Sequence, residues 1–306
     1  MKIAVLSSHT QSLFWFRMDM MKEFIKSGHT VIALGPDKKG DWNDKFQEYN
    51  INYQQLYVER NGVNPLKDLK TFGELYKFMK KEKPDKVFVY QAKTVIYGSI
   101  AARLNGITEV YPLIAGLGSI FRGTGFKNKI VKTIMKAEYW IACKCSKKVF
   151  FQNNDDKSEF IHNGLIKENK TFIINGSGVN IKKFEPTPLP KKPAFLFIGR
   201  LIKDKGIIEY LEACKEVKMK HPNIRCLLVG PYDSNPSALK QEELKPYIDS
   251  RIIDYYGEQS DVRPFIAQCS TFVLPSYHEG TPKVVLEAMA MGRPIITSNA
   301  LGVEKL

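Results

Sequence analysis

Residues 275–297 read PSYHEGTPKVVLEAMAMGRPIIT, and the four residues before them, TFVL, are typical of a buried strand. Thr281 suits the N-cap of a helix, and Pro282 suits its first position, where a missing N–H costs nothing. We therefore expect a strand, a loop and a helix, with Glu279 on the loop at the carboxyl end of the strand. Side chains tilt toward the N-terminus of a helix, so Glu287 should lean back toward the same place.

This arrangement predicts a site for a ligand that carries both phosphate and hydroxyl groups. A helix N-terminus favours anions, and two carboxylates beside it accept hydrogen bonds from hydroxyl groups. A nucleotide-sugar combines these two chemistries. The candidate binding residues are Gly280 and Thr281 at the helix start, with Glu279 and Glu287 on either side of it.

The stretch resembles the glycosyltransferases of family 4, which share the two-domain GT-B fold. The similarity covers the Glu-x7-Glu spacing, the Pro-Ser pair before it, the Leu-Glu-Ala-Met-Ala segment around Glu287 and Gly-Arg-Pro at 292–294. It implies an α/β protein of two Rossmann-like domains, whose doubly wound parallel sheets face each other across a cleft. It also implies retention of configuration by same-face attack without an enzymic nucleophile, with Glu279 binding sugar hydroxyls and Glu287 the ribose.

Short apolar runs alternate with helical patterns along the chain, as in parallel doubly wound sheets. Strands are expected at 2–6, 30–34, 52–57, 86–90, 110–113, 148–151, 171–174, 194–198, 224–229, 251–255, 271–274 and 294–297. Helices are expected notably at 14–27, 66–81, 95–105, 127–143, 206–218 and 282–291.

Four prolines at 186–193 indicate a linker. It would separate an N-terminal acceptor domain, 1–185, from a C-terminal donor domain, 194–306. Family members usually continue for several more strands and helices, so the resemblance implies that the second domain is incomplete.

A second motif follows the first strand of the C-terminal domain. Residues 199–206, GRLIKDKG, resemble the family's G-R-L-x3-K-G element, which holds the donor diphosphate. Gly199 would end the strand, Arg200 can fork two phosphate oxygens, and Lys205 adds a point charge. Both cations would also stabilise charge on the departing diphosphate, which removes the need for a metal. Gly230, at the end of the next strand, is expected to form part of the donor-site wall.

The N-terminal domain should carry the acceptor site. Lys93 follows the 86–90 strand, and Gly116 and Gly118 would let the backbone approach a ligand closely. Asn175 is expected at the domain hinge. This pattern resembles the subgroup that adds sugars to polyprenyl-diphosphate-linked glycans of capsule and O-antigen.

Two departures from the family pattern lie in this domain. The loop around 115–118 lacks the histidine that many members place near the transferred sugar. In the first loop, Ser-Ser-His-Thr at 7–10 replaces the usual Gly-Gly.

A net charge of +14 calls for an acidic partner: nucleic acid, anionic lipid or a diphosphate substrate. No nucleic-acid-binding motif is visible, so nucleic acid is not expected. Residues 126–140 predict a helix with apolar residues near one face and Lys129, Lys132 and Lys136 on another. Such a helix can lie on an anionic membrane, or it can be an ordinary surface helix with a solvated basic face. The sequence leaves both alternatives open.

Several other classes of protein are disfavoured. The five cysteines form no Cys-x2-Cys pair and suggest buried thiols in a reducing cytoplasm. No apolar stretch is long enough to span a membrane, and the N-terminus does not resemble a signal peptide. Asp155-Asp156 fits a helix N-terminus better than a metal site. We expect a cytoplasmic protein associated peripherally with the inner face of the cell membrane, with no metal or cofactor.

The sequence therefore predicts a retaining, metal-independent glycosyltransferase. It would move a hexose or N-acetylhexosamine from a UDP-sugar to a polyprenyl-diphosphate-linked saccharide during bacterial surface polysaccharide synthesis. Glu279, Arg200 and Lys205 are the candidate catalytic residues. Two alternatives remain open: a GT-B enzyme similar to UDP-N-acetylglucosamine 2-epimerase, and a non-catalytic nucleotide-sugar-binding fragment.

Overall fold

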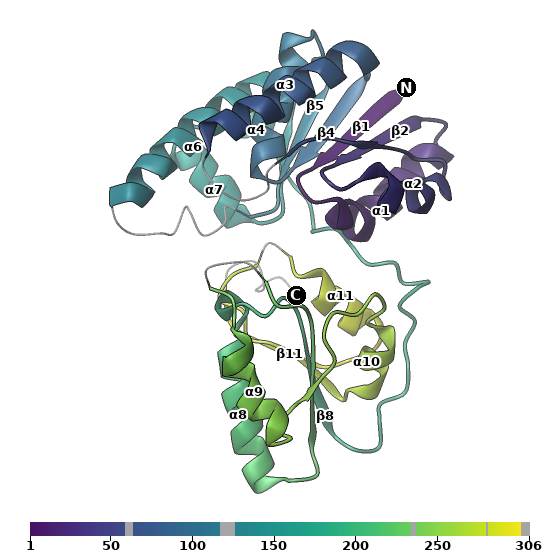
Figure 1. Cartoon of the computed structure of the whole chain (residues 1–306), viewed down its shortest axis with the longest axis vertical. Helices are drawn as coiled ribbons and strands as arrows, with labels where there is room; N and C mark the ends of the chain where they lie inside the picture. The colour runs from purple at the N-terminus through teal and green to yellow at the C-terminus, as the bar shows by residue number, and fades with distance from the viewer. Residues whose placement is uncertain (59–63, 117–125, 234–236, 280, 301–306) are drawn as a thin grey trace. The chain divides into compact units, whose positions relative to one another are not determined.

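The computed structural model describes residues 1–58, 64–116, 126–233, 237–279 and 281–300. Contacts group the chain into two compact units, Met1–Asn175 and Gly176–Leu306 (Figure 1). Each unit is built on one parallel sheet covered by helices, which confirms the expected α/β class.

The N-terminal unit contains a sheet with the strand order β3-β2-β1-β4-β5-β6-β7. All its pairings are parallel, for example Leu6 opposite Leu34 on one side and Val89 on the other. Its strands are β1 (Lys2–Ser7), β2 (Thr30–Gly35), β3 (Asn52–Gln55), β4 (Lys86–Tyr90), β5 (Val110–Ile114), β6 (Val149–Phe151) and β7 (Thr171–Ile173). The order reverses between β1 and β4, so the carboxyl ends of these two strands form the switch point where such sheets bind ligands.

Helices cover both faces of this sheet and bury two apolar clusters against it. One cluster lies under α1 (Thr10–Lys26) and α2 (Lys39–Gln47). The other lies under α3 (Pro65–Glu82), α4 (Ala92–Leu104), α6 (Phe126–Cys145) and α7 (Asn154–His162). The Asp155-Asp156 pair lies in the first turn of α7, as expected, and Asn153 caps that helix through a 2.7 Å bond from the Asp156 N–H.

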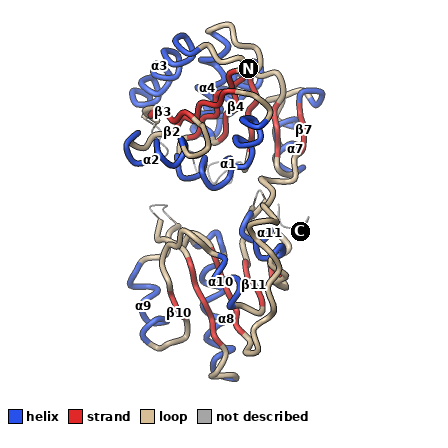
Figure 2. The backbone as a smooth tube through the Cα atoms, turned by 90° about the vertical axis from the view of Figure 1, so that its right-hand side faces the viewer, coloured by secondary structure: helices blue, strands red, loops and turns tan. Residues whose placement is uncertain are grey.

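The C-terminal unit has the strand order β10-β9-β8-β11-β12, again all parallel. Its strands are β8 (Ala194–Ile198), β9 (Arg225–Val229), β10 (Asp254–Tyr255), β11 (Thr271–Leu274) and β12 (Ile295–Thr297). Its helices are α8 (Ile207–Lys220), α9 (Gln241–Asp249), α10 (Arg263–Gln268) and α11 (Lys283–Ala290). Figures 1 and 2 show α8 and α9 on one face of the sheet, with α10 and α11 on the other.

The predicted strands are all present, with ends that shift by a few residues, whereas α2 and α9 are additional helices. One capping prediction is wrong. α11 begins at Lys283, and Pro282 occupies the N-cap with an extended backbone (φ −72°, ψ 107°). Thr281 therefore lies one residue before the cap, and no side chain caps this helix.

The proline segment is not a free linker, and the division between the units falls ten residues before the predicted end of the first domain. Phe184 is buried in the apolar core of the C-terminal unit. Beyond it, the Thr187 N–H donates to the Met291 carbonyl over 3.3 Å. The buried guanidinium of Arg293 donates to the carbonyls of Thr187, Pro188 and Ile266, over 3.0, 3.1 and 2.8 Å. The segment is thus a strap bound along the C-terminal unit.

Replacing Arg293 with methionine should lower the free energy of unfolding by about 2–4 kcal/mol, because several buried carbonyls lose a charged donor. Urea denaturation of the purified protein measures the change. Arg293→Lys should recover part of the loss, whereas Lys215→Met, on the exposed side of α8, should have no effect. If Arg293→Met were as stable as the unmodified chain, the bonds from Arg293 to the strap would not stabilise the unit.

Candidate functional site

The strongest candidate site lies at the carboxyl edge of the second sheet, where the loops after β8 and β11 meet. Lys205 Nζ lies 2.5 Å from Glu279 Oε1, and the two side chains are only 21% and 9% exposed. Two of the three predicted catalytic residues, 74 positions apart, are therefore in direct contact. The sequence predicted that both would act on the donor but not that they would pair.

Backbone packing brings these two loops together. Gly206 ends the first loop with φ +74°, and a Cβ on it would lie 2.1 Å from the Pro275 carbonyl oxygen. The Tyr277 N–H and the Ser276 hydroxyl both donate to the Asp204 carbonyl, over 3.0 and 3.2 Å. Only glycine fits at 206, because both its backbone conformation and the space around it exclude a side chain.

Gly199 and Gly230 are adjacent at the same edge of the sheet. Gly230 has φ +147°, and a Cβ on it would lie 1.8 Å from the Gly199 carbonyl oxygen. The Gly199 N–H bonds the Val229 carbonyl over 3.0 Å, and the Gly230 N–H bonds the Gly257 carbonyl over 2.8 Å. Because residue 230 is a glycine, the two strand-end loops can pack in direct backbone contact. Contact of Gly199 and Gly230 with the donor stays a prediction.

Arg200, the predicted phosphate fork, is held by a carboxylate that sequence reasoning missed. Its Nη1 lies 2.8 Å from Asp233 Oδ2. The Arg200 side chain is 42% exposed, whereas that of Asp233 is 15% exposed. A guanidinium carries five N–H donors in a fixed plane, so one bond to Asp233 orients the plane. The signal available in the sequence was an acidic residue three positions after Gly230, in the neighbouring strand-end loop.

Glu287 lies in a charged but poorly solvated setting on α11. Burial raises its pKa to about 7, the neighbouring Lys283 and Lys183 oppose that rise, and Asp261 adds to it. Lys283 Nζ is 4.0 Å from Glu287 Oε1. A carboxyl with this pKa changes charge near neutral pH.

Thr281 packs against Gly176, the first residue of the C-terminal unit. A Cβ on Gly176, where φ is +68°, would lie 2.7 Å from the Cβ of Thr281. Asn175, the predicted hinge residue, is exposed and is the last residue before the division between the units. Gly280 lies outside the described residues.

Of the three residues predicted for the acceptor site of the N-terminal unit, the structure describes Lys93 and Gly116. Lys93 is ion-paired to Asp68 of α3 over 2.6 Å, and both side chains are largely buried. Gly116 has φ +147° with open space where a Cβ would be, so its conformation, not crowding, favours glycine. Gly118 lies outside the described residues. Their role at the acceptor site stays a prediction.

A polar network at the switch point of the first sheet was not predicted. Gln91 has φ 74° and ψ 142°, a rare backbone conformation for a residue with a side chain. Its Oε1 accepts from the Ser7 hydroxyl, the Ser8 N–H and the Ser8 hydroxyl, over 2.8, 2.9 and 2.7 Å, and its Nε2 donates to Ser12 over 3.1 Å. This side chain links the loop after β4 to the loop after β1 and to the first turn of α1. The sequence signal was a polar residue directly after the VFVY strand.

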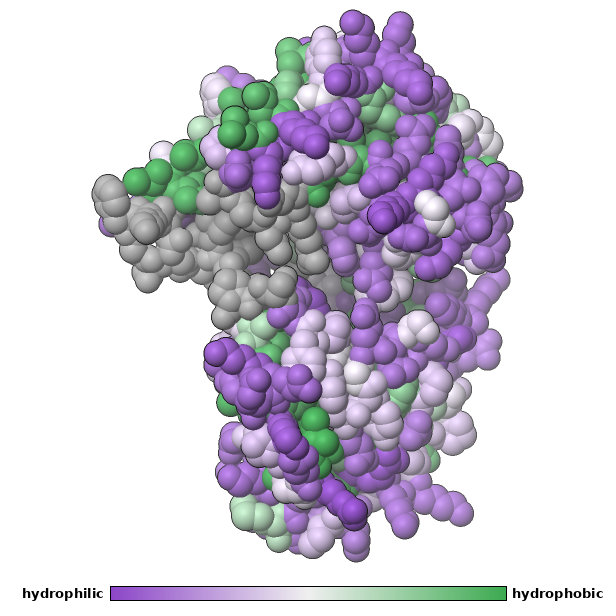
Figure 3. Space-filling model, viewed as in Figure 1, coloured by the Kyte–Doolittle hydropathy of each residue, from purple (hydrophilic) through white to green (hydrophobic). Residues whose placement is uncertain are grey.

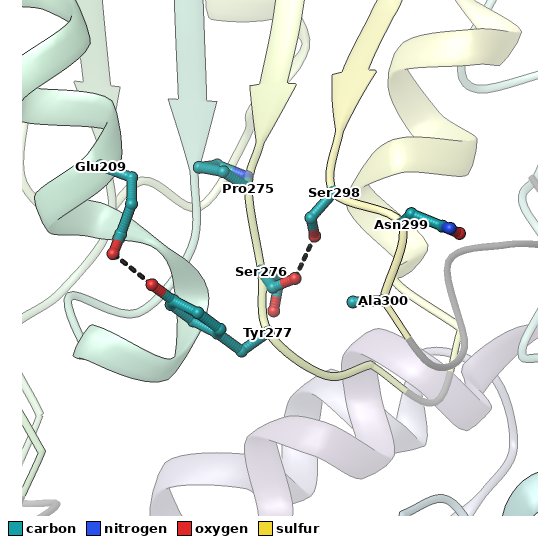
Figure 4. A pocket seen from close by; sticks show the side chains of 7 residues that line it. All are labelled: Glu209, Pro275, Ser276, Tyr277, Ser298, Asn299 and Ala300. Atoms are coloured by element: carbon teal, nitrogen blue, oxygen red, sulfur yellow. Dashed lines mark hydrogen bonds between the residues drawn. The ribbon is translucent and has the colours of Figure 1, made fainter.

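A cavity of about 520 Å³ opens beside the candidate site. Its walls come from α8 and from the loops after β11 and β12, namely Glu209, Pro275, Ser276, Tyr277, Ser298, Asn299 and Ala300 (Figure 4). The Tyr277 hydroxyl donates to Glu209 over 2.5 Å, and the Ser298 hydroxyl donates to the Ser276 carbonyl. The cavity shares its loop with Glu279 but contains none of the predicted site residues.

The described residues contain no group of three or more His, Cys, Asp or Glu side chains able to hold a metal ion. In the same parts of the chain, no helix has the length and apolar character needed to cross a membrane.

Comparison with known proteins identifies the family. Residues 192–306 match the model described as glycosyl transferases group 1, and residues 2–153 match the glycosyl transferase 4-like model. The N,N'-diacetylbacillosaminyl-diphospho-undecaprenol alpha-1,3-N-acetylgalactosaminyltransferase of Campylobacter jejuni is 31% identical over 316 aligned positions, covering 99% of this chain and 81% of that protein. The UDP-Gal:alpha-D-GlcNAc-diphosphoundecaprenol alpha-1,3-galactosyltransferase of Escherichia coli is also 31% identical, covering 78% of this chain and 64% of its relative.

Solved structures agree on the fold. Anabaena Alr3699/HepE in complex with UDP and glucose superposes with a TM-score of 0.75 at 16% identity, covering all of this chain and 82% of that one. Sucrose-phosphate synthase from Thermosynechococcus elongatus superposes with a TM-score of 0.76 at 17% identity, covering 99% and 82%. The expected GT-B fold is confirmed.

The chain belongs to the group 1, family 4-like glycosyltransferases. It is a glycosyltransferase, which confirms the predicted class of enzyme. The relatives support this function over the epimerase and over the non-catalytic fragment.

The raised pKa of Glu287 gives a stability test with a definite sign. Below about pH 4.5 the carboxyl is protonated in both states, whereas between about 4.5 and 7 only the unfolded chain ionises. Folding is therefore opposed increasingly as pH rises through that window, by up to ~3 kcal/mol. Urea unfolding from pH 4.5 to 8 should show Glu287→Gln gaining stability relative to the unmodified chain as pH rises. A stability difference that is constant with pH would refute the raised pKa.

Proposed function

We propose that this enzyme transfers a hexose or N-acetylhexosamine from a UDP-sugar to a polyprenyl-diphosphate-linked saccharide, with retention of configuration. The names of the Campylobacter and Escherichia relatives specify undecaprenyl-diphosphate-linked acceptors, and the Anabaena structure holds UDP. The product would enter a bacterial surface polysaccharide, as for the capsular relative of Staphylococcus aureus.

The Lys205–Glu279 contact carries the proposal within this chain. Lys205 pairs with Glu279, since Lys205 Nζ and Glu279 Oε1 are 2.5 Å apart in a largely buried place. An entering diphosphate carries more negative charge than one carboxylate, so it would attract Lys205 and the guanidinium of Arg200. Glu279 would then be released to accept hydrogen bonds from sugar hydroxyls. Donor binding would thus assemble the sugar site by exchange of partners.

The proposed chemical step is a same-face substitution at C1 of the donor sugar. The bond from sugar C1 to the diphosphate oxygen breaks, and the acceptor hydroxyl forms a new bond to C1 on the same face. The hydroxyl proton passes to an oxygen of the departing UDP. Arg200 and Lys205 stabilise the charge that builds on UDP, and Glu287 would accept hydrogen bonds from the ribose. No step requires a metal or a cofactor.

A lipid-linked acceptor also requires access to a membrane. We propose a cytoplasmic enzyme that associates peripherally with the inner face of the cell membrane. The net charge of +14 favours an anionic surface.

Glu279→Gln should reduce sugar transfer by about 100-fold or more, because a neutral amide loses the charged acceptor that the sugar hydroxyls need. The measurement is the rate of UDP release during transfer from a panel of UDP-sugars to an undecaprenyl-diphosphate-linked saccharide. Unchanged circular dichroism would show that the fold is intact. The matched control is Glu216→Gln on the exposed side of α8, which should retain full activity. Full activity of Glu279→Gln would remove this residue from the site.

Lys205→Met should weaken UDP binding about tenfold or more, since it removes one of two cations from the diphosphate site. EDTA should leave UDP affinity and transfer unchanged if these cations replace a metal. Isothermal titration calorimetry with UDP, with and without EDTA, separates the two effects. Loss of binding in EDTA with recovery on adding Mn²⁺ or Mg²⁺ would contradict metal independence.

A further inference from the structure

The loop after β11 has a second side-chain link to the segment after β8. Figure 4 shows the Tyr277 hydroxyl of this loop directed at the Glu209 carboxylate of α8, and the two oxygens are 2.5 Å apart. Glu209 lies in the first turn of α8, four residues after Lys205, and Tyr277 precedes Glu279 by two residues. The same two segments are therefore linked twice, once through Lys205 and Glu279 and once through Tyr277 and Glu209.

The hydroxyl of Tyr277 is suited to remain a donor. The hydrogen bond to Glu209 raises the pKa of Tyr277, and the charge of Glu209 raises it further. The phenol therefore stays protonated at neutral pH and donates to a carboxylate, which is a stronger acceptor than a neutral oxygen.

The backbone between Tyr277 and Glu279 is short and well anchored at its start. The Ser276 hydroxyl lies 3.2 Å from the Asp204 carbonyl oxygen and 3.2 Å from that of His278. The Tyr277 N–H donates to the same Asp204 carbonyl over 3.0 Å. One residue, His278, separates Tyr277 from Glu279, so a displacement of the tyrosine is passed directly to the carboxylate.

The two links respond differently to the donor. In the proposed function, the diphosphate attracts Lys205, and the Lys205–Glu279 contact is given up. The Tyr277–Glu209 bond does not take part in that exchange, because neither residue belongs to the diphosphate site. It is then the side-chain link that still joins the first turn of α8 to the loop that carries Glu279.

The Tyr277–Glu209 bond is made in contact with water. Tyr277 is 60% exposed, and Glu209 is exposed as well. On the side of the C-terminal unit that Figure 3 shows, the surface is mostly hydrophilic with small apolar areas between. Water competes for hydrogen bonds at such a surface, so this bond adds little to the stability of the folded unit. We therefore expect its loss to be seen in the position of the loop.

We propose that Tyr277 and Glu209 are positioning residues for Glu279, and that their hydrogen bond keeps the sugar-binding loop against α8 while Lys205 contacts the diphosphate. The proposal rests on the proposed function in that Lys205 must leave Glu279 when the donor binds. Neither Tyr277 nor Glu209 touches the donor. They act through Glu279, whose hydrogen bonds to the sugar depend on its place to within about 1 Å.

Tyr277→Phe removes the hydroxyl and keeps the ring. It should lower kcat for sugar transfer at least about fivefold, because the loop then also occupies positions in which Glu279 does not reach the sugar hydroxyls. UDP affinity in isothermal titration calorimetry should stay within about twofold, since Arg200 and Lys205 are unchanged. Unchanged kcat, or a loss confined to UDP affinity, would overturn the proposal.

Substitutions of the partner test whether the bond itself is responsible. Glu209→Gln keeps an oxygen that can accept from Tyr277 and should retain most of kcat, whereas Glu209→Ala should behave as Tyr277→Phe does. The double variant Tyr277→Phe with Glu209→Ala should be no slower than either single variant, and strictly additive losses would contradict a shared bond. The matched control is Tyr247→Phe, which removes a hydroxyl that donates to Glu212 elsewhere on α8 and should leave kcat unchanged.

A measurement without transfer separates this proposal from the proposed function. Lys205→Met removes the first link in the absence of any donor. In that variant, adding Tyr277→Phe should speed hydrogen exchange of the backbone amides at 277–279 by about fivefold or more, against less than about twofold in the unmodified chain. Equal acceleration in both chains overturns the positioning role. If the unmodified chain releases no UDP with any donor and acceptor of the panel, the proposed function fails, and hydrogen exchange still decides on the bond.

Discussion

At the carboxyl edge of the second sheet, two backbone contacts are so close that no side chain fits between the loops that make them. The loop after β8 passes so close to Pro275 that Gly206 cannot carry a side chain, and Gly230 lies against Gly199 in the same way. The charged groups depend on these contacts, because Lys205 reaches Glu279 only where the two loops touch. The site is therefore a closely packed backbone frame that carries a small number of paired charged side chains.

The fold was predictable because the information is local. Strands buried on both faces read as continuous apolar runs, and glycines and prolines mark their ends. The helix α2 was missed because its sequence, KGDWNDKFQ, buries only Phe46 and lacks an apolar stripe. The helix α9 was missed because Pro246 stands inside it. Tertiary contacts stabilise both helices despite these weak local signals.

The candidate site was predictable in its residue types but not in its contacts. The motifs identified Glu279, Arg200 and Lys205, whereas their partners depend on packing between distant loops. Asp233 lies 33 positions from Arg200, so no local pattern connects them. For α6, periodicity showed two faces but not which of them is buried. That choice is made by Tyr139 and Cys143, which pack into the core of the N-terminal unit.

The strap along the C-terminal unit is part of that unit's own packing and extends the unit beyond its sheet. Four carbonyls and a hydroxyl from two separate segments surround the Arg293 guanidinium, which is 3% exposed. A fragment that began at β8 would lack the carbonyls of Thr187 and Pro188 that accept from Arg293, and it would also lose Phe184 from the core. The smallest part of this half that can fold by itself must therefore begin before Phe184, so the proline-rich stretch is part of the domain that it was expected only to connect.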